Sequence, residues 1–82
     1  MDWLQQVAGV LEVEAPSPQQ TNQVLELARD VAHGVERRIT PVSTLLVGMS
    51  VERRRAAGEP FADALTAVLS EVRAAIPPAH RA

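Results

Sequence analysis

Apolar residues recur at intervals of three and four along most of the chain, and no stretch alternates apolar and polar residues as a half-buried strand does. This periodicity predicts an all-α fold. Because short connections usually join antiparallel neighbours, we expect a compact four-helix bundle. The helices are predicted over about residues 3–12, 18–38, 41–57 and 60–76, followed by a frayed tail over 77–82 that begins with two prolines.

Residues that start and stop helices stand where the periodic segments meet. Ser17 is placed to cap the second helix, with Pro18 at the first helical position and Gln20 three residues after the cap, as in a capping box. Thr40 is placed to cap the third helix, and Pro41 lacks the N–H that would continue the second. These signals predict a tight turn between the second and third helices.

The first predicted helix is short, with Asp2 placed as its N-cap. Its apolar residues fall on one face: Trp3, Leu4, Val7, Ala8 and Leu11. An isolated helix of this length is marginal in water, so we expect it to depend on tertiary contacts.

The third predicted helix is apolar around more of its circumference than one stripe requires. Its apolar residues are Val42, Leu45, Leu46, Val47, Met49 and Val51. Such a helix either lies at the centre of the fold or faces a partner. Gly48 interrupts it at a cost on the order of 1 kcal/mol, which suggests a packing reason such as a close approach to Ala32. The helix is expected to end before Gly58, which tolerates positive φ.

The composition fits one domain over residues 1–82. The chain is 46 % hydrophobic and 22 % charged, which is typical of a folded globular protein and unlike a disordered one. It has no cysteine, which excludes disulfides, thiol nucleophiles and cysteine-ligated metals. It shows no targeting segment and no apolar run of about 18 residues, so we expect a cytoplasmic protein that does not enter the membrane.

Polar and ionisable residues gather in one part of the second predicted helix. The candidate binding residues are Asp30, His33, Gly34, Glu36, Arg37 and Arg38. On a continuous helix, Asp30, His33 and Arg37 would share one face. Asp30 would then fix the tautomer of His33, and Arg37 would meet an anionic ligand or a partner's carboxylate. The alternative interpretation is a solvated ladder of surface charges.

Other kinds of site find less support in the residues. The second histidine, His80, lies in the predicted tail, so we expect no metal site and no cofactor. Ser43 or Ser50 could be combined with His33, but no strand-turn-helix elbow is present to hold a nucleophile, and we predict no catalytic residue.

Nucleic-acid binding is a minor alternative. The arginines cluster at residues 37–38 and 53–55, which a helix of roughly 20 Å would hold at opposite ends of an antiparallel pair. The net charge of −2 also differs from the basic footprint of nucleic-acid-binding proteins. Both observations argue against a single phosphate-binding patch.

The run from Leu25 to Leu46, together with Asp2, Trp3 and Leu4 at the start and with Gly48, resembles a family of short bacterial domains of unknown function. This family is similar to the tail domain fused to molybdenum cofactor guanylyltransferases. The resemblance implies a stand-alone accessory to molybdenum cofactor synthesis or delivery, with a guanylyltransferase or a molybdoenzyme as partner. It does not imply nucleotidyl transfer, because the chain lacks a glycine-rich phosphate loop.

Two hypotheses about function follow. In the first, the chain is a non-catalytic interaction module whose third helix and 30–38 segment bind a partner protein or a second copy of the chain. In the second, Asp30, His33 and Arg37 form a site for a phosphate-bearing pterin or nucleotide, in a small-molecule binder or minor enzyme.

Overall fold

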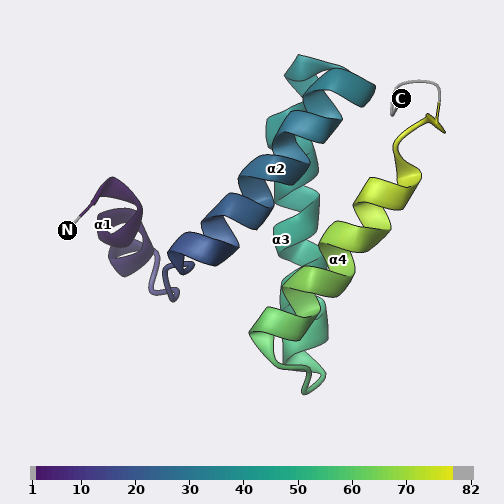
Figure 1. Ribbon diagram of the computed structural model, residues 1–82. Helices are drawn as coiled ribbons and strands as arrows, with labels where there is room; N and C mark the ends of the chain where they lie inside the picture. Colours follow the sequence, from purple (N-terminus) through teal and green to yellow (C-terminus); the bar gives the residue numbers. More distant parts are fainter. Residues whose placement is uncertain (1, 79–82) are drawn as a thin grey trace.

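The computed structural model describes residues 2–78, and this part of the chain contains α-helices and one short 3-10 helix but no strand (Figure 1). The all-α class and the four helices are therefore confirmed. The predicted tail lies outside the described residues from position 79 onwards. The elements are α1 (Trp3–Val10), α2 (Pro18–Gly34), η1 (Arg37–Ile39), α3 (Thr40–Ala56) and α4 (Phe61–Ala75).

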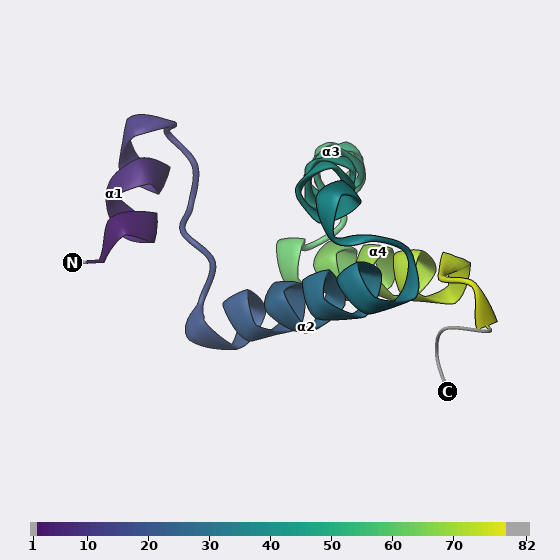
Figure 2. The same ribbon diagram turned by 90° about the horizontal axis from the view of Figure 1, so that it is seen from above.

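Three helices, α2, α3 and α4, pack against one another in an up-down-up arrangement (Figure 1). Seen from above, α2 and α4 run side by side and α3 lies across one face of the pair (Figure 2). One buried apolar face of each helix points into a shared core. The buried residues of this core are Leu27, Val31, Val47, Val51, Ala64, Leu65, Val68, Leu69 and Ile76.

Helix α1 stands apart from this core. It approaches none of the other helices, and Figure 2 shows it separated from them by an extended connection. Its ends are stabilised locally: Asp2 Oδ1 accepts a hydrogen bond from the N–H of Gln5 at 2.9 Å, and the N–H of Val13 donates to the carbonyl of Ala8 at 2.9 Å. The second bond turns the chain at Glu12, whose φ is 57°. The tertiary contacts expected for this helix are absent within residues 2–78.

The boundaries agree with the prediction to within two residues except at the end of α2. This helix ends at Gly34 and not at residue 38, because glycine and the β-branched Val35 both favour helices weakly. Val35 leaves the helical region, at φ −122° and ψ −85°, and Glu36 is extended. The chain then forms η1 before α3 begins.

The predicted capping box of α2 is present. The N–H of Gln20 donates to Ser17 Oγ at 3.1 Å, and the N–H of Ser17 donates to Gln20 Oε1 at 2.9 Å. Thr40 is instead the first helical residue of α3, so its predicted role as a cap is wrong. The cap position is Ile39, which has no side-chain oxygen.

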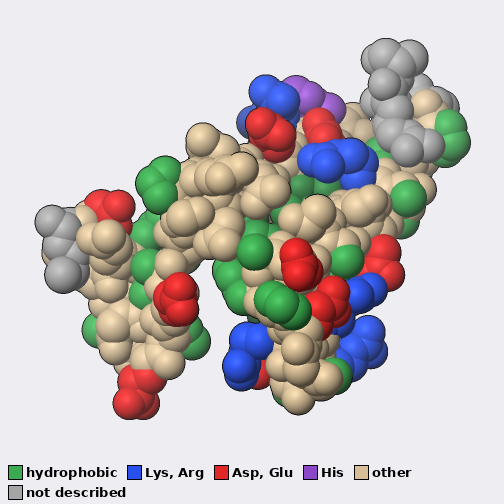
Figure 3. All heavy atoms as spheres, turned by 60° about the horizontal axis from the view of Figure 1, so that its bottom comes forward, with side chains coloured by type: hydrophobic (Ala, Val, Ile, Leu, Met, Phe, Trp, Pro, Cys, Tyr) green, Lys and Arg blue, Asp and Glu red, His purple; other side chains and the backbone are tan. Residues whose placement is uncertain are grey.

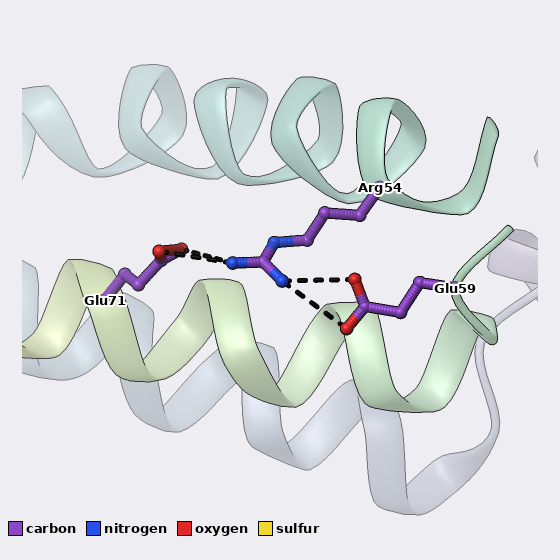
Figure 4. Close-up of polar contacts among 3 residues, drawn as sticks. All are labelled: Arg54, Glu59 and Glu71. Carbon is purple, nitrogen blue, oxygen red and sulfur yellow. Dashed lines mark hydrogen bonds and ion pairs between the residues drawn. The ribbon is translucent and has the colours of Figure 1, made fainter. Parts of the chain in front are cut away.

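The end of α3 is stabilised twice, by its backbone and by Arg54. Gly58 adopts φ 107°, which lets the N–H of Glu59 donate to the carbonyl of Arg54 at 3.1 Å. The Arg54 guanidinium also pairs with the carboxylates of Glu59 at 3.1 Å and Glu71 at 3.3 Å (Figure 4). These hydrogen bonds, chiefly the one to Glu59, raise the pKa of Arg54. One side chain therefore fixes the turn after α3 and joins α3 to α4.

Replacing Gly58 with alanine is expected to lower the free energy of unfolding by about 1–2 kcal/mol, because a Cβ is strained at this φ. Chemical denaturation followed by circular dichroism measures the change. Gly48→Ala is the matched control: a Cβ at this helical position meets no atom within 4 Å, so stability should stay the same or rise. Equal effects of the two substitutions would contradict the role given to Gly58.

Replacing Arg54 with glutamine is expected to lower the melting temperature and to increase hydrogen exchange in the turn at residues 57–60, because both carboxylate contacts are lost. Arg53→Gln is the control, since Arg53 is exposed and forms no ion pair within residues 2–78. The difference between the variants should shrink at about 1 M salt. A turn that is equally protected in both would contradict the role given to Arg54.

Candidate functional site

The continuous helix expected over residues 30–38 is interrupted after Gly34. Because α2 ends at Gly34, the residues that follow do not continue its helical face. Asp30 pairs across the fold with Arg73 of α4, whose Nε donates to Asp30 Oδ2 at 3.1 Å. Asp30 therefore joins α2 to α4 and does not orient His33.

The other candidate residues differ from one another in burial and in local structure. Gly34 is buried, which removes it from contact with a ligand, whereas His33 is exposed and its side chain forms no hydrogen bond within residues 2–78. The remaining three, Glu36, Arg37 and Arg38, are exposed in the extended residue and the first part of η1. Their role in binding stays a prediction.

The close approach expected between Gly48 and Ala32 is wrong. Gly48 is exposed, and a Cβ built on it would meet no atom within 4 Å apart from the neighbouring helical backbone. The glycine lowers the helical propensity of α3 without gaining any contact inside the described fold. Its position becomes informative once the surface around it is considered.

Gly48 lines a groove of about 560 Å³ between the segment that follows α1 and the body formed by α2, α3 and α4. The hollow between these parts is visible in Figure 3, with hydrophobic side chains on its walls. We call this hollow the groove. Its apolar lining includes Val13, Val24, Val51, Phe61 and Leu65, and Gly48 also lines it. Its volume is within the range of natural binding pockets.

The charged residues stand at the rim of the groove. Glu12 and Glu14 lie on the side of the connection, and Glu52 pairs with Arg55 on the side of α3 at 2.7 Å. The hydrogen bond from Arg55 lowers the pKa of Glu52. The groove is therefore an apolar surface with an acidic edge.

A second apolar surface lies on the side of α3 that faces away from the core. Four large side chains, which we call the outer row, are exposed there by half or more: Val42, Leu45, Leu46 and Met49. Val47 and Val51, on the opposite side of the same helix, are buried. The sequence of α3 is therefore apolar on two faces: one face packs in the core, and the opposite face is exposed to solvent.

Two kinds of structural feature are absent from the described residues. No group of three or more His, Cys, Asp or Glu side chains within residues 2–78 is arranged to hold a metal ion. Within the same residues, no helix has both the length and the apolar character needed to span a membrane.

A family model described as a domain of unknown function, DUF6457, matches residues 1–81. The chain belongs to this family. No curated protein and no solved structure matches the chain. The expectation of a short domain of unknown function is confirmed, and its relationship to the tail domain of molybdenum cofactor guanylyltransferases stays a prediction.

Sequence reasoning missed the groove of this DUF6457 domain. The groove depends on where the connection after α1 lies relative to α3, which residue spacing does not reveal. One signal was present, because Gly48 stands in the middle of a helix with no local need for glycine. The interpretation of this signal as close packing inside the chain was wrong.

Replacing Asp30 with asparagine is expected to lower the free energy of unfolding by less than about 1 kcal/mol, because its pair with Arg73 is 40 to 44 % exposed. Thermal and chemical denaturation at low and high salt would measure the loss and its screening. Glu26→Gln on the same helix is the control, since Glu26 is exposed and forms no ion pair within residues 2–78. A ligand that stabilises the wild type but not Asp30→Asn would favour the small-molecule hypothesis instead.

Proposed function

We propose that this chain is a non-catalytic interaction module that binds a partner protein through the outer row of α3. The observation that carries the proposal is the exposure of Val42, Leu45, Leu46 and Met49, by 50, 62, 58 and 62 %. Their spacing of i, i+3, i+4 and i+7 forms one continuous stripe along two turns of helix. Apolar stripes of this kind are the usual contact surface between helices of different proteins.

The energetics of the outer row suit a specific but modest interaction. Covering the exposed parts of four such side chains would contribute roughly 4–6 kcal/mol before the cost of association is subtracted. Arg53 extends the stripe by one turn beyond Met49 and is exposed. A matching partner therefore presents an apolar helix with a carboxylate near one end.

The proposed partner is a protein of molybdenum cofactor synthesis or delivery, either a guanylyltransferase or a molybdoenzyme, in the cytoplasm. The resemblance of residues 25–46 to the tail domain fused to molybdenum cofactor guanylyltransferases supports this identity. A domain that resembles one fused to an enzyme is suited to binding that enzyme.

Leu45→Asp combined with Met49→Asp is expected to reduce recovery of the partner at least about tenfold, because two charges would have to be buried at the contact. Affinity purification of the tagged chain from its native host, with mass spectrometry, measures the recovery of guanylyltransferases and molybdoenzymes. The melting temperature should change little, since both residues are exposed.

The control adds the same charge elsewhere, with Thr66→Asp and Ser70→Asp on the exposed side of α4. This variant should recover the partner as the wild type does. Equal recovery by all three proteins would overturn the outer row as the binding surface, and recovery of neither enzyme class with the wild type would overturn the proposed partner.

A further inference from the structure

Helix α1 presents an apolar surface that nothing in the described chain covers. Its side chains and those just after it are exposed: Trp3 by 69 %, Leu4 by 46 %, Val10 by 81 % and Leu11 by 64 %. A helix of 8 residues is too short to be stable in water without tertiary contacts. The sequence of α1 therefore requires a surface on which to pack.

The composition of α1 indicates what kind of surface this is. None of its residues, Trp3–Val10, is charged, whereas α2, α3 and α4 each carry several charges. An uncharged helix can enter an apolar groove without burying an ion, which would cost several kcal/mol. Among the helices of this chain, α1 alone has the composition of a helix that is buried on docking.

The groove has the matching properties. Its walls are apolar, and Gly48 leaves open space where any other residue would project a side chain. The charges of Glu12 and Glu14 stay at the rim. Trp and similar large aromatic side chains are the usual anchors of such contacts, and Trp3 is the only tryptophan of the chain.

We propose that α1 of one copy docks in the groove of a second copy and that the contact is reciprocal, so that the chain forms a two-fold symmetric dimer with exchanged N-terminal helices. Trp3 is the anchor in this contact, and Gly48 provides the space for it. The proposal is independent of the proposed function, because the dimer uses the groove and leaves the outer row free.

The geometry favours a second copy over the chain's own α1. Glu12, Val13, Glu14 and Pro16, in the connection after α1, already form one wall of the groove. The helix of the same chain could fill the groove only if this wall moved away, whereas the helix of a second copy enters with the wall in place. An end helix joined by an extended connection is also the usual element exchanged between copies.

The reciprocal contact covers twice as many apolar side chains as a single docked helix. With both α1 helices docked, the exposed parts of Trp3, Leu4, Val10 and Leu11 of each copy leave water. Docking only one helix would cover half as many, whereas a stable interface buries about 1,200–2,000 Å² in total. The exchange is therefore expected to be reciprocal.

Sedimentation equilibrium of the full chain, from low to high micromolar concentration, is the first test. The mass is expected to rise with concentration from 8.9 kDa to twice that value. Over the same range, the fluorescence of Trp3 should shift to shorter wavelength as the ring leaves water. A chain that stays monomeric with unshifted emission would overturn the proposal.

Two variants locate the contact. Trp3→Asp removes the anchor and Gly48→Leu fills the groove, and each is expected to weaken dimerisation at least about tenfold. Far-UV circular dichroism of Gly48→Leu should retain the helical signal of α2, α3 and α4, because the new side chain projects into open space. Only the contribution of α1 should decrease. A mixed dimer of the two variants has one intact contact, between α1 of the Gly48→Leu chain and the groove of the Trp3→Asp chain, and one contact that carries both substitutions. Because a stable dimer needs both contacts, the mixture should associate much more weakly than the wild type.

Each of the other possible results of these experiments counts against one of the two proposals. A monomer whose Trp3 emission is already shifted, and in which Gly48→Leu reverses the shift, would place α1 in the groove of its own chain and overturn the exchange. A dimer abolished by Leu45→Asp and Met49→Asp but not by Trp3→Asp would place the second copy on the outer row and overturn the proposal. A wild-type chain that dimerises through α1 but recovers neither a guanylyltransferase nor a molybdoenzyme would contradict only the proposed function.

Discussion

The structure depends on burying one face each of α2, α3 and α4 in a single shared core. Leu27 is fully buried at its centre, and the valines and leucines around it come from all three helices. Each buried side chain of this size contributes about 1.5–3 kcal/mol, so the positions of the three helices are fixed by a small number of contacts. Because each helix has only one face in the core, its opposite face must meet solvent or another molecule.

The size of the chain sets how much apolar surface remains outside. In a domain of 82 residues, only roughly 60–65 % of the surface of the unfolded chain can be buried. Large exposed hydrophobic residues are isolated on α2 and α4, at Leu25 and Phe61, whereas α3 carries a row of them that includes Leu45 and Met49. The exposed side of α3 is therefore a specific property of its sequence and does not follow from the small size of the domain alone.

Local signals in the sequence predicted the local structure. The capping box at Ser17 and the glycine after α3 at Gly58 involve residues within a few positions of each other, so their spacing is sufficient to identify them. Asp30 shows that residue spacing does not predict contacts between residues that are far apart in the sequence. Its partner, Arg73, is 43 residues away, and only the packing of α2 beside α4 brings the two together.

The missed end of α2 had a larger effect on the interpretation of function. The periodicity continues past Gly34 into Val35, and a helix drawn through both residues places His33 and Arg37 on one face. A break of one residue at Val35 redirects the chain and separates them. A candidate site inferred from helical spacing is therefore only as sound as the helix boundary on which it depends.

The two apolar surfaces of α3 are neighbours on the same helix. Gly48 faces the groove, while Leu45, three residues before it, and Met49, the next residue, belong to the outer row. Residues three apart on a helix lie side by side, so a helix docked over Gly48 would border the outer row directly. Dimerisation through the groove would then place α1 of the second copy beside the outer row and leave the four side chains of that row uncovered.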